Sequence, residues 1–373
     1  MTSVAFHVDQ LFAAVPGGIG TYVRELVPAM AAEDPELDVV LFSSRFPSPR
    51  LPEAWMDEFP YRRLDHGPRR LYPAWDLLGR PRLPPSLGGL AVLHAPGPAA
   101  MPPPGRGQRL VATVHDLAFR HYPQLFPPAW RALYRLGTRR AARTAAAVIA
   151  VSASTARDLV RHTRVDPDRV HVVPLAASAP AGSADPEPAL ARLRIPRPFV
   201  LYMGTLEPRK NLIRLVRGYR RAVMSSGLPH ALVLSGPLGW RHRRLHGEIA
   251  SGGPGDVVLT GPVGPEDRDA LYRGAELFVY PSLYEGFGLP VLEAMVRGTP
   301  TIVSTASSLP EVAGDAAVGV HPRSVTELAL AIERVLTDGA EAERLSVAGR
   351  ARAERFSWRR TARMTLDVYR SVL

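Results

Sequence analysis

The stretch Tyr280–Met295, Y-P-S-L-Y-E-G-F-G-L-P-V-L-E-A-M, has the pattern of a strand end, a glycine turn and a helix start. The apolar run Leu277–Tyr280 predicts a buried strand, and Pro290 predicts the first turn of a helix, where proline is tolerated. Glu285 and Glu293 flank the turn in apolar surroundings, where an unpaired charge is costly. Parallel α/β sheets bind ligands where strands end and helices begin, so this stretch predicts a ligand site in such a sheet.

Short apolar runs alternate with segments of helical period along the whole chain, which predicts parallel sheet with both faces covered. The strands expected in the first half are Val4–Val8, Val39–Phe42, Ala91–His94, Leu110–Val114, Val148–Val151 and Val170–Val173. Those expected in the second half are Phe199–Met203, Ala231–Ser235, Val257–Thr260, Leu277–Tyr280, Thr301–Val303 and Val318–Val320. The intervening helices include Thr21–Ala32 and Pro290–Arg297.

Residues 176–188, A-A-S-A-P-A-G-S-A-D-P-E-P, are small, polar and proline-rich, as a linker is. The chain therefore predicts two α/β units in tandem, which its 373 residues comfortably accommodate. No cysteine is present, so disulfides and thiolate metal sites are excluded. The sequence contains no run of 18 apolar residues, so we expect no membrane-spanning helix. Residues 1–10 lack the pattern of a secretory signal.

The net charge of +11 raises the alternative of a nucleic-acid-binding protein, but the charge is evenly divided, +6 over residues 1–178 and +5 over residues 179–373. Residues 117–157 are an exception, with seven arginines and no acidic residue. They form either an anion-facing surface or a solvated helix face. Within them Pro128–Arg135 is an aromatic and basic helix that would dock on anionic lipid, and core packing of Trp130 and Tyr134 is the alternative.

Lys210 is the only lysine among 46 basic residues. An ammonium differs from a guanidinium in size, hydration and donor geometry, so the only lysine in this arginine-rich chain indicates a position where that difference matters. Lys210 and Arg209 stand directly before an expected helix, where the helix dipole adds to their charge. This loop, Gly204–Asn211, predicts a site for a doubly charged phosphate.

Two further strand ends carry polar or glycine-rich groups in the first half. Gly18 lies in P-G-G-I-G before the helix expected near Thr21, which is either an anion-binding turn or an ordinary helix entry. His115 ends an apolar strand in T-V-H-D-L, where it either bonds a substrate hydroxyl or has a structural role.

Five segments together resemble the retaining glycosyltransferases of family 4, which have the GT-B fold, two doubly wound Rossmann-like domains facing each other across a cleft. In chain order they are G-G-I-G, H-D-L, G-x4-R-K-N from Gly204, E-x7-E from Glu285 to Glu293, and S-S-L-P-E-V-A-G-D-A-A from Ser307. The resemblance implies an N-terminal domain over residues 1–178 and a nucleotide-sugar domain over 190–355. It also implies that a helix in residues 356–373 crosses back to the N-terminal domain.

The resemblance assigns roles to these residues. Glu285 is expected at the donor hexose near the reacting centre, Glu293 at the ribose, and Arg209 with Lys210 at the diphosphate, where they stabilise the leaving nucleotide. His115 would contact the sugar from the other domain. Loop amides complete the expected donor site at Gly18, Gly204, Phe287, Gly288 and Leu289, and the loop at Val263 is expected to meet the base.

The expected function is transfer of a hexose, mannose favoured, from a nucleotide diphosphate sugar such as GDP-mannose to a glycan, lipid-linked or small-molecule acceptor with retention. The resemblance implies no metal or other cofactor, and we interpret Asp166–Asp168 (D-P-D) as a proline turn rather than a cation site. A pyridoxal phosphate phosphorylase using Lys210 is a further alternative. We expect a cytoplasmic protein, peripheral at the inner face of the membrane if the lipid-docking alternative holds, with no nucleic-acid partner.

Overall fold

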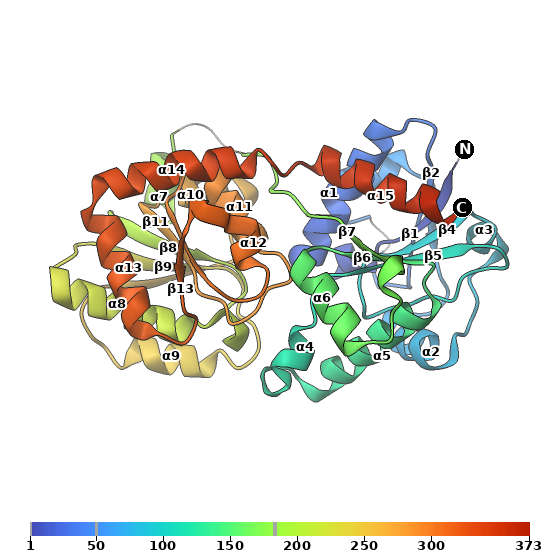
Figure 1. Ribbon diagram of the computed structural model, residues 1–373, viewed down its shortest axis with the longest axis horizontal. Coiled ribbons are helices and arrows are strands. Elements are labelled where there is room, and N and C mark those ends of the chain that lie inside the picture. Colours follow the sequence, from blue (N-terminus) through green and yellow to red (C-terminus); the bar gives the residue numbers. More distant parts are fainter. Residues whose placement is uncertain (1, 49–50, 182–184) are drawn as a thin grey trace. The chain divides into compact units, whose positions relative to one another are not determined.

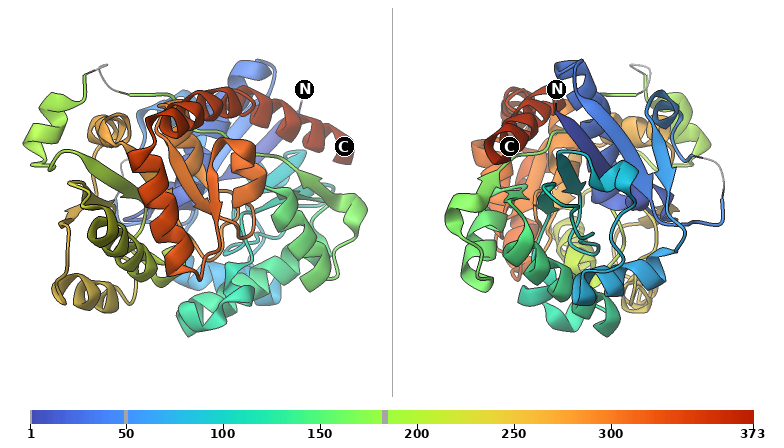
Figure 2. Two further views of the ribbon diagram at one scale, coloured as in Figure 1. Left: turned by 60° about the vertical axis from the view of Figure 1, so that its left-hand side comes forward. Right: turned by 90° about the vertical axis from the view of Figure 1, so that its right-hand side faces the viewer.

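The structure is a computed structural model that describes residues 2–48, 51–181 and 185–373. Its contacts divide the chain into two compact units, Met1–Leu175 with Ser357–Leu373, and Ala176–Phe356. Residues 182–184 of the predicted linker lie outside the described part. In each unit the strands lie between helices, as Figure 1 and the two further views of Figure 2 show.

Among the described residues, unit 1 holds a parallel sheet of seven strands. The strands are β1 (Ser3–His7), β2 (Asp38–Ser43), β3 (Tyr61–Arg63), β4 (Val92–Ala95), β5 (Arg109–Val114), β6 (Ala147–Ala150) and β7 (Val170–Val172), in the spatial order β3-β2-β1-β4-β5-β6-β7. The helices are α1 (Gly17–Glu33), α2 (Pro68–Leu78), α3 (Pro85–Gly88), α4 (Ala118–His121), α5 (Pro128–Thr144), α6 (Ala153–His162) and α15 (Trp358–Val372).

Unit 2, within its described residues, holds a parallel sheet of six strands. The strands are β8 (Phe199–Met203), β9 (Ala231–Ser235), β10 (Val257–Gly261), β11 (Leu277–Tyr280), β12 (Thr301–Ser304) and β13 (Val318–Val320), in the order β10-β9-β8-β11-β12-β13. The helices are α7 (Glu187–Arg192), α8 (Leu212–Ser226), α9 (Arg243–Ala250), α10 (Pro265–Gly274), α11 (Leu289–Val296), α12 (Leu309–Ala313), α13 (Val325–Thr337) and α14 (Gly339–Ala353).

The central strands are buried along their whole length, as β8, β9, β11 and β12 show. Helices on both faces remove the alternation of buried and exposed residues that a one-sided sheet would have. The predicted class of two Rossmann-like α/β units is therefore confirmed. In unit 2 the strand order reverses between β8 and β11, and in unit 1 between β1 and β4. Ligands of such sheets bind beyond the carboxyl ends of strands at that reversal.

Helix α15 returns to unit 1, where it packs against α1 (Figure 1). Its buried apolar side chains recur every three or four residues, at Trp358, Ala362, Leu366 and Tyr369, which is the period of one helix face. No helix of the described residues is long and apolar enough to cross a membrane.

Some elements differ from the sequence prediction. Helix α1 begins at Gly17, four residues before the expected start, so the glycines of G-G-I-G form its first turn instead of a preceding loop. Strand β3, α2 and α9 were not predicted. The first is a three-residue edge strand, and α2 carries Pro68 at its start and Pro73 inside, which resembles a loop signal.

Candidate functional site

Two loops meet at the carboxyl edge of the unit 2 sheet because β8 and β11 are parallel neighbours. The loop after β8 contains a single 3₁₀ turn, Pro208–Lys210, directly before α8. The loop after β11 runs to α11. The backbone N–H of Leu283 donates to the carbonyl oxygen of Arg209 at 2.9 Å, which joins the two loops.

Glu285 lies where these loops meet, and both expected phosphate-binding cations contact its carboxylate. Arg209 Nη1 lies 2.8 Å from Oε2 and Lys210 Nζ lies 2.6 Å from Oε1. Lys210 Nζ also donates to the Tyr280 hydroxyl at 2.8 Å. Glu285 and Lys210 are 6% and 7% exposed, so this is a nearly buried ion cluster. The structure thus brings together three residues that the sequence predicted for one site.

A second carboxylate balances the charge of the cluster. Glu207 Oε1 accepts from Arg209 Nε at 3.0 Å and lies 2.9 Å from its Nη2. Burial alone would raise the pKa of Glu285, but the charges of Arg209 and Lys210 and the hydrogen bonds hold it at about 2. Burial and the Arg209 charge lower the pKa of Lys210, and Glu285 opposes that shift. Glu285 is therefore ionised at neutral pH.

Serine side chains brace the turn that presents Glu285. Ser307 Oγ accepts from the backbone N–H of Glu285 at 2.7 Å. Ser308 Oγ contacts the carbonyl oxygens of Glu285 at 3.0 Å and Phe287 at 2.8 Å. Both serines come from the S-S-L-P segment before α12. The two serines thus bond to the backbone of the turn, which fixes the position of the Glu285 carboxylate and leaves its oxygens to other partners.

Two positions of the loops require glycine. Gly288 has φ +114°, and a Cβ there would lie 2.7 Å from Leu309 Cδ2. Gly204 has φ +144°, and a Cβ there would lie 2.9 Å from the Tyr202 hydroxyl. Gly288 is the residue before α11, which begins at Leu289, so the amides expected to bind a ligand stand at a helix start, where backbone N–H groups lack intrahelical acceptors.

Glu293 belongs to a different group of side chains in unit 2. It is 4% exposed on α11, forms an ion pair with Arg268 and accepts from the Tyr272 hydroxyl at 2.8 Å. Both partners lie on α10, which follows the half-buried Val263 of the β10–α10 loop. The sequence placed both glutamates around one ligand. The structure gives Glu293 its own partners, and Arg268 links it to the helix after the predicted base loop.

In unit 1, His115 follows β5 and is held in one orientation. Its Nε2 lies 2.8 Å from the carbonyl oxygen of Pro96, and the ring meets Tyr22 edge-on at 5.1 Å. Burial lowers the pKa of His115, while the hydrogen bond to Pro96 and the charge of Asp116 oppose that shift. A bond to a carbonyl requires N–H at Nε2, so the neutral ring presents Nδ1 as an acceptor for a hydroxyl.

Gly18 is exposed in the first turn of α1. The neighbouring Gly17 has φ +60°, and a Cβ at Gly20 would lie 2.2 Å from Pro16 Cβ. The glycines therefore fit a tight helix start, in which the Gly20 N–H already donates to the Pro16 carbonyl oxygen at 3.0 Å. The contact of Gly18 with a phosphate stays a prediction.

Sequence reasoning missed several residues that hold the site together: Glu207, Tyr280, Tyr272, Arg268, Ser307 and Ser308. Glu207 lies within the predicted phosphate loop Gly204–Asn211, and the two serines lie within the segment that begins at Ser307. Their place in these motifs was the one sequence feature that could have indicated a role at the site. Arg268 and Tyr272 had none, because their contact with Glu293 depends on how α10 packs beside α11.

Comparisons with known proteins identify relatives over nearly the whole chain. A family model described as "Glycosyltransferase Family 4" matches residues 16–177, and one described as "Glycosyl transferases group 1" matches residues 191–352. The O-antigen chain mannosyltransferase B of Escherichia coli is 33% identical over 272 residues, which cover 72% of this chain and 71% of that protein.

A second relative and a solved structure agree with this. The MMP alpha-(1->4)-mannosyltransferase of Mycolicibacterium hassiacum is 32% identical over 72% of this chain and 66% of that protein. The structure of sucrose-phosphate synthase from Thermosynechococcus elongatus is 23% identical with a TM-score of 0.78, covering 100% of this chain and 99% of that one. The latter match extends the likeness of fold over both units.

Proposed function

Because this chain belongs to the family 4 glycosyltransferases of GT-B fold, we propose that it transfers a mannosyl group from GDP-mannose to a glycan or lipid-linked acceptor, with retention of anomeric configuration. The observation that carries the proposal is the cluster of Glu285, Arg209 and Lys210 beyond the carboxyl ends of two neighbouring strands. In this proposal the nucleotide diphosphate binds the cations of Arg209 and Lys210, and the sugar binds the Glu285 carboxylate.

Each member of the cluster has a stated role in this proposal. Glu285, ionised because of its cationic partners, accepts hydrogen bonds from donor sugar hydroxyls. Arg209 and Lys210 move part of their hydrogen bonding from the two carboxylates to the diphosphate as it gains charge in the transition state. Glu207 and Glu285 hold these cations in place before the donor binds, which reduces reorganisation during the reaction.

The remaining predicted residues complete the proposed donor site. Glu293 accepts from the ribose hydroxyls, with Arg268 and Tyr272 fixing its carboxylate. The loop at Val263 meets the base, and the amides at Gly18 and at Phe287 to Leu289 bind phosphate and sugar oxygens. His115 accepts a hydrogen bond from a sugar hydroxyl at Nδ1.

Support for mannose as the transferred sugar comes from the names of the relatives. Both the Escherichia coli and the Mycolicibacterium hassiacum proteins are named mannosyltransferases. The nucleic-acid-binding and phosphorylase alternatives are not favoured, since these relatives are glycosyltransferases matched over 72% of the chain.

We also propose that turnover needs no metal, because the cations of the cluster take the place of one at the diphosphate. Activity in EDTA is then expected to stay within about twofold of the untreated rate, since a twofold change is well under 1 kcal/mol of barrier. A rate that collapses in EDTA and returns with Mg²⁺ or Mn²⁺ would contradict this part of the proposal.

A ligand panel tests the donor. The full chain is heated with GDP, UDP, ADP and dTDP and their sugars, and GDP-mannose is expected to stabilise it by about 2.7 kcal/mol at 100 times its Kd. Lys210→Gln should lose most of this shift. Arg217→Gln, which changes an exposed cation of α8, should keep it.

The panel has clear contrary outcomes. Stabilisation by another nucleotide sugar would replace the donor and keep the enzyme class, whereas no response to any of the four would overturn the proposed function. With the donor known, the anomeric configuration of the product, read by NMR, tests retention.

For a lipid-linked acceptor, α5 offers the surface for contact with an anionic membrane. Trp130 is 54% exposed, so core packing does not explain that side chain, whereas the half-buried Tyr134 stacks on the buried Phe119. Arg131, Arg135, Arg139 and Arg143 are exposed at intervals of four residues, on one side of the helix. Co-sedimentation with vesicles should rise with anionic lipid and fall in Arg135→Glu/Arg139→Glu, and binding that ignores lipid charge would dispose of this surface.

A further inference from the structure

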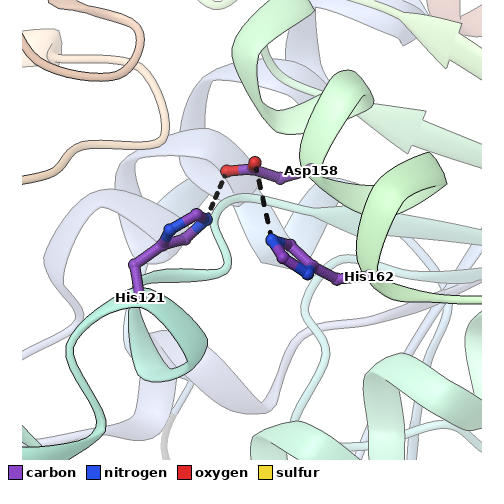
Figure 3. A group of neighbouring side chains, drawn as sticks. All are labelled: His121, Asp158 and His162. Carbon is purple, nitrogen blue, oxygen red and sulfur yellow. Dashed lines mark hydrogen bonds and ion pairs between the residues drawn. The ribbon is translucent and has the colours of Figure 1, made fainter.

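Two histidines and one aspartate gather on the surface of unit 1, outside the groups described above. Asp158 and His162 lie four residues apart in α6, hence on the same side of that helix, and His121 is the last residue of α4. His121 Nε2 lies 2.9 Å from Asp158 Oδ2, and His162 Nε2 lies 4.0 Å from Asp158 Oδ1. Figure 3 shows both imidazoles turned toward the one carboxylate.

One atom of this cluster lacks a partner. His162 Nε2 is buried and has no hydrogen-bond partner among the described residues. A buried polar nitrogen without a partner is destabilising by roughly 1–3 kcal/mol. It lies beside a carboxylate oxygen and another imidazole nitrogen, so a bound cation would satisfy it.

The spacing is close to that of a metal site. The three ligand atoms all lie within 4.8 Å of one another. With metal–ligand distances of about 2.0–2.2 Å, a tetrahedral ion holds its ligands about 3.3–3.6 Å apart, so small side-chain rotations would complete the site. Two imidazoles with one carboxylate suit zinc, cobalt or nickel, whereas magnesium and calcium prefer oxygen ligands alone.

We propose that His121, Asp158 and His162 bind one divalent cation of the zinc class, leaving a coordination position for water. The ion would tie the turn of α4 to helix α6. Arg120 and Arg161, the sequence neighbours of His121 and His162, carry positive charges that oppose a bound cation. The site is therefore expected to bind more weakly than one without neighbouring cations.

The cation would stabilise the strand end that carries His115. Helix α4 begins three residues after His115, and Thr155 Oγ1 of α6 donates to the His115 carbonyl oxygen at 3.1 Å. The two elements that the ion would link thus already flank that strand end. By contrast, Asp166 accepts from the N–H of Asp168 at 3.1 Å in a local turn, as expected for D-P-D.

Cobalt titration of the full chain, free of any affinity tag and treated with chelator, tests the proposal. We expect one Co²⁺ per chain with visible absorption bands, displaced by Zn²⁺ and unaffected by Mg²⁺ or Ca²⁺. At 100 times its Kd, Zn²⁺ should raise the melting temperature of the unit 1 transition by about 5–10 °C.

Three variants separate this site from other histidines. Asp158→Asn keeps an acceptor for His121 but is a poor metal ligand, so it should melt as the metal-free wild type and lose the cobalt bands. His162→Gln should lose them too. His242→Gln/His246→Gln removes another histidine pair four residues apart, with rings 5.4 Å apart, and should leave the bands unchanged.

The contrary outcomes are equally direct. Absent cobalt bands, bands that persist in both Asp158→Asn and His162→Gln, or bands lost in the His242→Gln/His246→Gln control would each overturn the proposal. The nucleotide panel is run in EDTA, which removes such a cation, so none of these outcomes bears on it.

Discussion

Lys210 places a small cation where a larger one would not fit the same contacts. Its Nζ lies 2.6 Å from Glu285, 2.8 Å from the Tyr280 hydroxyl and 5.1 Å from the centre of the Tyr280 ring. A guanidinium is planar and fixes its donors in a fork, so Lys210→Arg keeps the charge but displaces the donors. We predict a fall in kcat of at least about tenfold, equal to about 1.4 kcal/mol, with the donor under steady-state kinetics.

The reverse exchange at the surface is the control. Arg217 pairs with Glu248 on an exposed face of α8, and Arg217→Lys should keep normal kinetics. Normal turnover of Lys210→Arg would mean that positive charge alone suffices at this position, and the single lysine would have no special role.

Asp76 on α2 predicts a pH-dependent stability. Burial raises its pKa to about 7, against the opposing effects of the Met101 N–H bond and Arg140. The native state then holds a proton that the unfolded chain, with an aspartate pKa near 3.9, has lost, so this contribution to stability is full below about pH 4 and disappears above about pH 7. We predict that Asp76→Asn, which keeps an acceptor for Met101, is more stable than wild type at pH 8 by about 2–4 kcal/mol and equal to it near pH 4.

Denaturant unfolding of both proteins from pH 4 to 8 measures the difference. Asp65→Asn, at an exposed position, controls for the loss of one negative charge. A stability difference that does not grow with pH would show that the Asp76 carboxyl ionises normally in the native protein.

The contacts of single residues were predictable only where sequence position fixed them. The strand prediction placed Arg209, Lys210 and Glu285 at strand ends, and the family resemblance assigned them to one site. They lie close together because β8 and β11 are neighbouring parallel strands. The role of Glu293 in binding a ligand stays a prediction. Its partners could not be foreseen, because they depend on helix rotation, which the apolar pattern determines only within a broad face.

At the scale of elements, α8 and α13 pack closely at a glycine. A Cβ at Gly218 would lie 2.9 Å from Leu328 Cγ and 3.0 Å from its Cδ2, so alanine would force the helices apart. Overpacking costs about 1–3 kcal/mol and outweighs the helix propensity of alanine, about 1 kcal/mol. We predict that Gly218→Ala destabilises unit 2 by about 0.5–2 kcal/mol, measured by denaturant unfolding.

A second glycine provides the matched control. Gly247 lies within α9 with nothing near its Cβ position, so Gly247→Ala should stabilise by about 0.5–1 kcal/mol. The double variant Gly218→Ala/Leu328→Ala should lose less free energy of unfolding than the sum of the losses in the two single variants, because the shorter side chain relieves the contact. If the losses of stability in the two single variants simply added up in the double variant, the destabilisation by Gly218→Ala would not come from its contact with Leu328.

Central elements were predictable because burial on both faces leaves a continuous apolar run, as in β8 and β11. Edge strand β3 has only half-buried and exposed residues, so it lacked that signal. Helix α9 has a single buried residue, Leu245, and too little apolar pattern to be recognised.

At the scale of the molecule, the end of the chain completes unit 1. The boundaries at Leu175 and Phe356 lie close to those expected from the linker composition and the family resemblance. The helix after Phe356 was assigned to the first unit by that resemblance alone. The sequence pattern could not have assigned this helix, because one apolar face shows that a helix packs on a core but not which unit supplies that core.

Helix α15 makes contacts that the rest of unit 1 cannot replace. The Tyr369 hydroxyl lies 2.5 Å from His94 Nδ1 on β4, Thr361 donates to the Pro174 carbonyl oxygen at 2.7 Å, and Arg363 pairs with Glu33 of α1 at 2.7 Å. Tyr369 is fully buried, so Tyr369→Ala should destabilise unit 1 by about 3–5 kcal/mol. Leu373→Ala, at an exposed position, should change little.

Hydrogen exchange distinguishes the two units in these variants. In Tyr369→Ala, and more strongly in a chain ending at Phe356, amides of α1 and β4 should exchange faster, because α15 no longer covers them. Amides of β8 and β11 should keep their protection, since unit 2 has its own core. Equal loss of protection in both units would mean that they unfold as one cooperative body, and unchanged exchange in α1 would mean that α15 does not stabilise unit 1.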